Sequence, residues 1–150
     1  MDLDVAPLIS RWLHLVGVII AIGGAACLRF AVLPALKTIS NEDERQRVHE
    51  VLRARWARVV QVSIAVIFLT GAANFLLLAL PPKVEPMPYH AIFGLKFFAA
   101  MFIFFIASAL VGKSPAFAGI RAKREKWLTI LLLTAAVVVL VSLSLGYIRG

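Results

Sequence analysis

The chain has 150 residues, of which 61% are hydrophobic and only 16% charged, and its formal net charge is +8 at pH 7. Soluble domains are nearer half apolar and a quarter charged, so this composition excludes an ordinary soluble domain. The basic excess lies between long uncharged runs, which is a topology signal of membrane proteins, and nucleic acid is not expected as a partner.

The apolar runs predict helices that cross a bilayer, because a spanning helix needs about 20 mostly apolar residues. We expect an all-α integral membrane four-helix transmembrane bundle, built as a single transmembrane domain over residues 1–150. Prolines at 81 and 82 end the second span, since proline cannot continue the helical hydrogen bonds. The four spans are expected at about 8–36, 59–80, 90–112 and 127–148.

The first span carries the polar residues that are least expected inside a bilayer. His14 and Arg29 lie within the apolar run, where an imidazole or a charge is costly and is by default a functional hypothesis. Two interpretations of Arg29 stay open: its guanidinium reaches out to lipid phosphates, or it holds an anionic group within the bundle. Gly17, Ala21 and Gly24 share one helical face with His14. This stripe indicates either close helix packing or a trough for a flat, bulky group below a histidine ligand.

The segment after the first span is expected to contain a helix. Ser40 and Asp43 have the spacing of a capping box, and the acidic residues at 42–44 favour the positive end of a helix dipole. Apolar residues then recur at helical spacing and lead into the second span. Two interpretations remain open: a segment that docks on lipid or a partner, and a solvated extension of the second helix.

Basic residues predict the direction of the helices. Lys and Arg are concentrated between spans one and two and between spans three and four, and such segments remain in the cytoplasm. We therefore expect a multi-pass protein of the bacterial plasma (inner) membrane, with both termini and the 81–89 turn outside and the basic loops cytoplasmic. The tryptophans at the span ends are interpreted as interface anchors: Trp12, Trp56 and Trp127.

Each span also places one polar residue about six residues inside its outer end, or about 9 Å below the surface. These residues are His14, Asn74, Lys96 and Ser142. One polar group on each helix, including an imidazole and an amine, indicates a site. His90 begins the third span at interface depth and is either an interfacial residue or a further ligand.

Short stretches of the chain resemble a known family of membrane proteins. They are Arg11-Trp-Leu-His14-Leu-Val-Gly17, Gly23-Gly24, Leu28-Arg29-Phe30 before Pro34, basic 53–58 leading into a helix with Gly71, and Gly94-Leu95-Lys96-Phe97. Together with the layout of the spans, these stretches resemble the HemJ-type protoporphyrinogen IX oxidases and their CopD-like relatives. The histidine and lysine are the most specific part of the resemblance.

The resemblance implies a four-helix membrane protein that binds haem b, with His14 as the axial iron ligand. The expected cofactor-binding residues are His14, Gly17, Asn74, Lys96 and His90. Lys96 matches the family's functionally important lysine, and Lys96 and Arg29 are the expected catalytic residues. HemJ-type enzymes remove electrons from protoporphyrinogen IX, so a porphyrin is the implied substrate. CopD-like relatives are linked to copper, but this chain has no evident cluster of copper ligands, since it has one Cys and three His.

Two functions from different classes remain open. The first is a haem-dependent redox protein, in which Lys96 holds a porphyrin carboxylate or transfers a proton and Arg29 meets propionates or a quinone-like acceptor. The second is a non-catalytic transmembrane subunit of a larger membrane complex, because short loops leave little surface beyond the helices. A small transporter is less favoured, since four spans leave little room for a central pathway. Expected partners are membrane lipid and either a second copy of the chain or such a complex.

Overall fold

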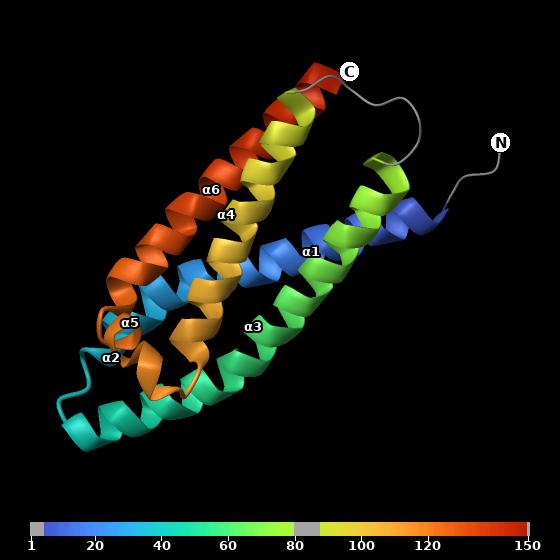
Figure 1. Ribbon diagram of the computed structural model, residues 1–150. Coiled ribbons are helices and arrows are strands. Elements are labelled where there is room, and N and C mark those ends of the chain that lie inside the picture. The colour runs from blue at the N-terminus through green and yellow to red at the C-terminus, as the bar shows by residue number, and fades with distance from the viewer. Residues whose placement is uncertain (1–4, 80–87, 150) are drawn as a thin grey trace.

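A computed structural model describes residues 5–79 and 88–149, with side chains described for 5–76 and 94–143. All described elements are helical (Figure 1). They are α1 (Val5–Cys27), a π-helical turn η1 (Leu28–Val32), α2 (Leu33–Leu36), α3 (Glu42–Ala79), α4 (Pro88–Val111), a 3-10 turn η2 (Pro115–Phe117), α5 (Ala118–Ala122) and α6 (Arg124–Arg149). Four helical stretches are long and apolar enough to cross a membrane. The prediction of an all-α chain with four membrane-compatible helices is confirmed.

The first of these stretches is one continuous helical run from Val5 to Leu36, formed by α1, η1 and α2. Its 32 residues correspond to about 48 Å at the α-helical rise, which exceeds the roughly 30 Å of a bilayer core. In Figure 1 the run is inclined to α4 and α6, and tilt is one way in which a long helix fits a bilayer. The π turn, which contains Arg29, interrupts the α-helical hydrogen-bond pattern, and such turns often mark functional positions.

The second stretch is the 38-residue helix α3, which begins well before its apolar part. The side-chain oxygen Oδ1 of Asn41 accepts a hydrogen bond from the backbone amide of Glu44 at 3.2 Å, which is the geometry of a helix cap. The capping box predicted at Ser40 is therefore wrong by one residue, although the acidic first turn of the helix is confirmed. The segment before the second span is a helical extension of that span.

The long helices pack as two pairs. α1 packs mainly on α3, and α4 packs mainly on α6, while contacts between the pairs are fewer (Figure 1). The pairs converge on a cluster of buried apolar side chains near the α2 and α5 end of the bundle. The cluster consists of Ala25, Leu33, Leu36, Ile106, Leu128 and Leu131. Its position leaves the rest of the space between the pairs less tightly filled.

Close packing of α1 on α3 depends on one glycine. A Cβ atom added to Gly24 would lie 1.9 Å from Cη2 of Trp56, far inside the 3.5–4.0 Å at which carbon atoms pack. The indole of Trp56 thus lies across Gly24, and the side chain is only partly exposed. The ring of Trp56 therefore fills the contact between two helices, and its role as an interface anchor stays a prediction.

Candidate functional site

A cavity of about 1790 Å³ lies between the two helix pairs. Apolar side chains form most of its wall. His14, Asn74, Lys96 and Ser142, the four residues predicted at one depth, all line it. The four residues predicted at one depth therefore share one cavity.

Two hydrogen-bond partners from α3 orient the His14 imidazole. Its Nδ1 atom lies 3.1 Å from the carbonyl oxygen of Ile67 and 3.0 Å from the hydroxyl of Thr70. The Thr70 hydroxyl donates its own proton to the carbonyl of Val66 at 2.5 Å, so it meets Nδ1 as an acceptor. A carbonyl can only accept, and Nδ1 must therefore carry the ring proton. In a neutral imidazole with its proton on Nδ1, Nε2 keeps its lone pair, and no hydrogen bond to Nε2 occurs within the part of the chain that the structure describes.

Two glycines make room for this arrangement. A Cβ atom added to Gly71 would lie 3.3 Å from Cε1 of His14, so a side chain there would press on the ring. Gly17 is buried, and a Cβ atom added to it would lie 2.9 Å from Cγ1 of Ile67. Gly17 thus lets α3 approach α1 closely enough for the Ile67 carbonyl to reach His14. Gly17 faces α3 and is not among the residues that line the cavity.

Two of the other three polar groups at this end, Lys96 and Asn74, lack a pairing partner among the described residues. Lys96 lies close enough to His14 to interact with it electrostatically, and none of the described carboxylates pairs with its ammonium group. The amide oxygen Oδ1 of Asn74 is buried, again without a hydrogen-bond partner in the described chain. The Ser142 hydroxyl, by contrast, donates to Val138 within its own helix. A buried acceptor without a partner and an unpaired cation are costly, and both suit a site that receives a polar ligand.

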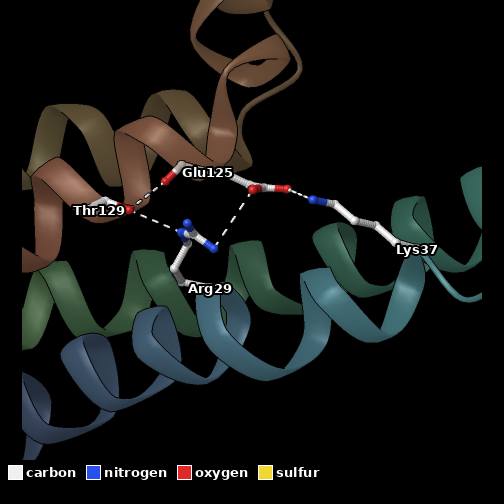
Figure 2. A network of polar contacts seen from close by, with 4 residues as sticks. All are labelled: Arg29, Lys37, Glu125 and Thr129. Atoms are coloured by element: carbon white, nitrogen blue, oxygen red, sulfur yellow. Dashed lines mark hydrogen bonds and ion pairs between the residues drawn. The ribbon is translucent and has the colours of Figure 1, made fainter.

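Arg29 belongs to a different set of contacts (Figure 2). Its Nε atom donates to the hydroxyl of Thr129 at 3.1 Å, and its Nη1 lies 3.8 Å from Oε2 of Glu125. Oε1 of Glu125 also pairs with Nζ of Lys37 at 2.6 Å. This Arg29 network ties the π turn and the end of α2 to the first turns of α6. About 15 residues separate Arg29 from His14 along one helical run, or roughly 22 Å, so the structure does not bring these two predicted site residues together.

The remaining predicted ligand, His90, lies in the first turn of α4. Its side chain is outside the described residues, so its role as a ligand stays a prediction. Among the residues that the structure describes, there is no group of three or more His, Cys, Asp or Glu side chains that would hold a metal ion.

Three residues that orient His14 were not identified as site residues from the sequence. Ile67 contributes only a backbone carbonyl and Thr70 is an ordinary residue of an apolar helix, so neither carries a sequence signal. Gly71 does carry one, because a glycine inside a helix costs stability and often marks close packing.

Comparisons with protein-family models, curated proteins and solved structures find no match to this chain. The arrangement itself is one histidine nitrogen without a hydrogen bond among the described residues and one lysine at the end of an apolar cavity.

Proposed function

We propose that this chain is a membrane redox protein that would bind haem b between the α1/α3 and α4/α6 pairs, where Nε2 of His14 would hold the iron. The observation that carries the proposal is the hydrogen bonding of Nδ1, which leaves the Nε2 lone pair available. Histidine ligands of metals ordinarily donate their second ring N–H to a carbonyl or similar group, which fixes the ring orientation. His14 meets this requirement through Ile67.

The volume and the apolar walls of the cavity suit a haem group. Small-molecule sites usually enclose about 300–1,000 Å³ and have mainly apolar walls; this cavity is larger, at about 1790 Å³. Haem supplies one-electron redox chemistry, and its potential depends on the axial ligand and on burial. The unpaired ammonium of Lys96 suits a porphyrin carboxylate, and Asn74 Oδ1 accepts a hydrogen bond from a donor on the ligand or from water.

The substrate proposed from the family resemblance is protoporphyrinogen IX. A reduced porphyrin has carboxylates for Lys96 to bind, and its oxidation releases protons from the bridging carbons and pyrrole nitrogens while the electrons pass to a quinone-like acceptor. Lys96 then has one of two roles: it holds a carboxylate, or it passes a proton. Lys96→Arg separates them, because arginine keeps the charge but does not deprotonate in proteins. Normal activity in Lys96→Arg supports carboxylate binding, whereas normal substrate affinity with lost turnover supports proton transfer.

The direct test of haem binding is spectroscopic. The protein is purified in detergent from cells supplied with haem, and its oxidised and dithionite-reduced spectra are recorded with a pyridine haemochromogen assay. We expect a stoichiometric b-type signal that His14→Ala abolishes and that His49→Ala retains, with all proteins monodisperse. A colourless protein that co-purifies with fixed amounts of another membrane protein contradicts the proposal and favours the non-catalytic subunit.

The orientation proposed for the bilayer follows from the basic segments: both termini outside and the basic loops in the cytoplasm of a bacterial plasma membrane. Single cysteines at positions 83 and 123, in a Cys27→Ser background, test it with a thiol reagent that does not cross membranes. We expect labelling of position 83 from outside intact cells, and labelling of position 123 only after lysis. The reverse pattern contradicts the orientation.

A further inference from the structure

The opposite end of the same cavity is rich in arginine. Arg53, Arg121 and Arg124 line it there, together with His49. These residues come from the extension of α3, from α5 and from the start of α6. Segments that are distant in the sequence therefore contribute three arginines to the lining of this end of the cavity.

The carboxylates at this end are engaged mainly by other groups. Glu42 pairs with Arg45, and Glu125 pairs with Lys37 and Arg29 while its charge also acts on Arg124. Glu50 lines the cavity too, and its charge acts on His49. Among the described residues, no ion pair involves Arg53, Arg121 or Arg124. Among the described residues that line this end of the cavity, basic side chains still outnumber the carboxylates Glu42, Glu50 and Glu125.

Arg53 and Arg124 are nevertheless held in place by neutral groups. Nη1 of Arg53 donates to the carbonyl of Val111 at 2.9 Å and to that of Gly112 at 3.4 Å, at the end of α4. Nη1 of Arg124 contacts Nε2 of His49. A guanidinium can only donate, so Nε2 of His49 is the acceptor. Burial and the charges of Arg124 and Arg53 lower the pKa of His49, against an opposing effect of Glu50. Each arginine retains further N–H donors, because a guanidinium has five.

Arg121 is the group that lacks a partner. Its Nη1 atom is buried and has no hydrogen-bond partner within the described chain. A buried guanidinium nitrogen without an acceptor is costly, and an anionic oxygen at this position removes the cost. Guanidinium groups bind phosphate oxygens in bidentate geometry, so a phosphate is the anion that three arginines suit best.

From this arrangement we propose a binding site for an acidic phospholipid, with its phosphate among Arg53, Arg121 and Arg124 and an acyl chain in the apolar part of the cavity. A lipid is favoured over a free anion because one cavity is lined both by the three arginines and by apolar side chains such as Ile103, Phe104 and Leu131. Basic pockets between spanning helices are known to bind acidic headgroups. The site lies at the opposite end from His14 and does not depend on haem binding.

The test compares lipids and matched charge variants. The full-length protein in neutral detergent micelles is titrated with phosphatidylglycerol, phosphatidylcholine or inorganic phosphate while its melting temperature is followed. Arg121→Gln is the test variant. Lys123→Gln is the control, because Lys123 is an exposed base two residues away that does not line the cavity.

We expect saturable stabilisation by phosphatidylglycerol, little by phosphatidylcholine and none by inorganic phosphate. Arg121→Gln weakens the apparent affinity for phosphatidylglycerol about tenfold, as expected for loss of one charged hydrogen bond, while Lys123→Gln leaves it unchanged. Equal effects of the two variants contradict the site, because they indicate general charge attraction. Inorganic phosphate that reproduces the stabilisation overturns the lipid assignment in favour of a free anion.

A second measurement covers the case in which Arg121→Gln fails to fold. Native mass spectrometry of the unaltered protein, purified from its own membrane, is expected to retain one acidic phospholipid per chain. Arg121→Lys is expected to keep the charge and the fold but to retain less lipid, since lysine cannot form the bidentate contact. Retention of zwitterionic and acidic lipids in proportion to their abundance contradicts the proposal.

Discussion

Two polar clusters lie along the first helical run, and they differ in how their hydrogen bonds are satisfied. In the Arg29 network the side chains of Arg29, Lys37, Glu125 and Thr129 pair with one another (Figure 2). Around His14, the ring is oriented by α3, but Lys96 and Asn74 Oδ1 have no partner in the described chain. A satisfied cluster stabilises the fold, whereas an unsatisfied one has capacity left for a ligand. Polarity inside a membrane helix therefore does not identify a site until its partners are known.

The largest effect expected on the fold comes from filling the space at Gly24. Gly24→Ala forces the added methyl group into the Trp56 ring, and overpacking of this kind costs about 1–3 kcal/mol. Gly23→Ala is the matched control, because a Cβ atom there meets nothing within 4 Å. Thermal unfolding in detergent should show a clear loss for Gly24→Ala alone. Equal melting temperatures for the two variants contradict the packing of Trp56 on Gly24.

One substitution in each cluster compares the two clusters directly. Arg29→Met leaves Glu125 and Thr129 without their partner, and because these contacts are partly exposed their loss costs about 1 kcal/mol. Lys96→Met removes a cation that has no counter-ion among the described residues, so the ligand-free protein should be as stable as the original or more so. Haem content per folded chain is expected to fall in Lys96→Met and to stay unchanged in Arg29→Met. A loss of stability in Lys96→Met together with a loss of haem in Arg29→Met contradicts this difference between the clusters.

Gly71→Ala tests the orientation of the imidazole with little disturbance of the fold. The added methyl group would lie 3.3 Å from Cε1 of His14, so the ring must shift by a few tenths of an ångström. We expect a moved Soret maximum or lower haem occupancy, with the melting temperature of the haem-free protein nearly unchanged. Gly94→Ala is the control, since nothing lies within 4 Å of its added Cβ. Identical spectra for the two variants would show that the ring is not the iron ligand.

The smallest effect expected is the pH dependence of the Arg29 network. Hydrogen bonding from Lys37 and the charges of Lys37, Arg29 and Arg124 hold the pKa of Glu125 below its ordinary value. The stability that ionised Glu125 contributes is therefore complete above its ordinary pKa and is lost as the pH falls through the lower pKa of the folded protein. Because the pairs are partly exposed, the contribution is small. The melting temperatures of the original protein and of Glu125→Gln should converge in acid; a gap that persists contradicts this account.

Much of the fold could be predicted from the sequence because one property, hydrophobicity over about 20 residues, determines where a helix can cross a bilayer. The same spacing placed His14, Asn74, Lys96 and Ser142 at one depth, and they line one cavity. Depth along a helix follows from residue number alone. This part of the site was therefore accessible without a structure.

The partners of these residues could not be predicted, because they depend on how each helix is rotated against its neighbours. Arg29 meets Thr129 across 100 residues of sequence, and neither position indicates the other. The Ile67 carbonyl that orients His14 has no side-chain signal at all. The predicted capping residue was wrong because Ser40 and Asn41 are both good capping residues, and only the geometry selects Asn41.

The central claim is that Nε2 of His14 binds haem iron, and the optical spectrum of the purified protein tests it most directly. Oxidised and reduced spectra of the original protein, His14→Ala and His49→Ala should be compared at equal protein concentration after expression with haem available. The account predicts a b-type Soret band in the original protein and in His49→Ala, and its loss in a folded, monodisperse His14→Ala. A Soret band unchanged by His14→Ala, or an original protein without colour, contradicts the claim.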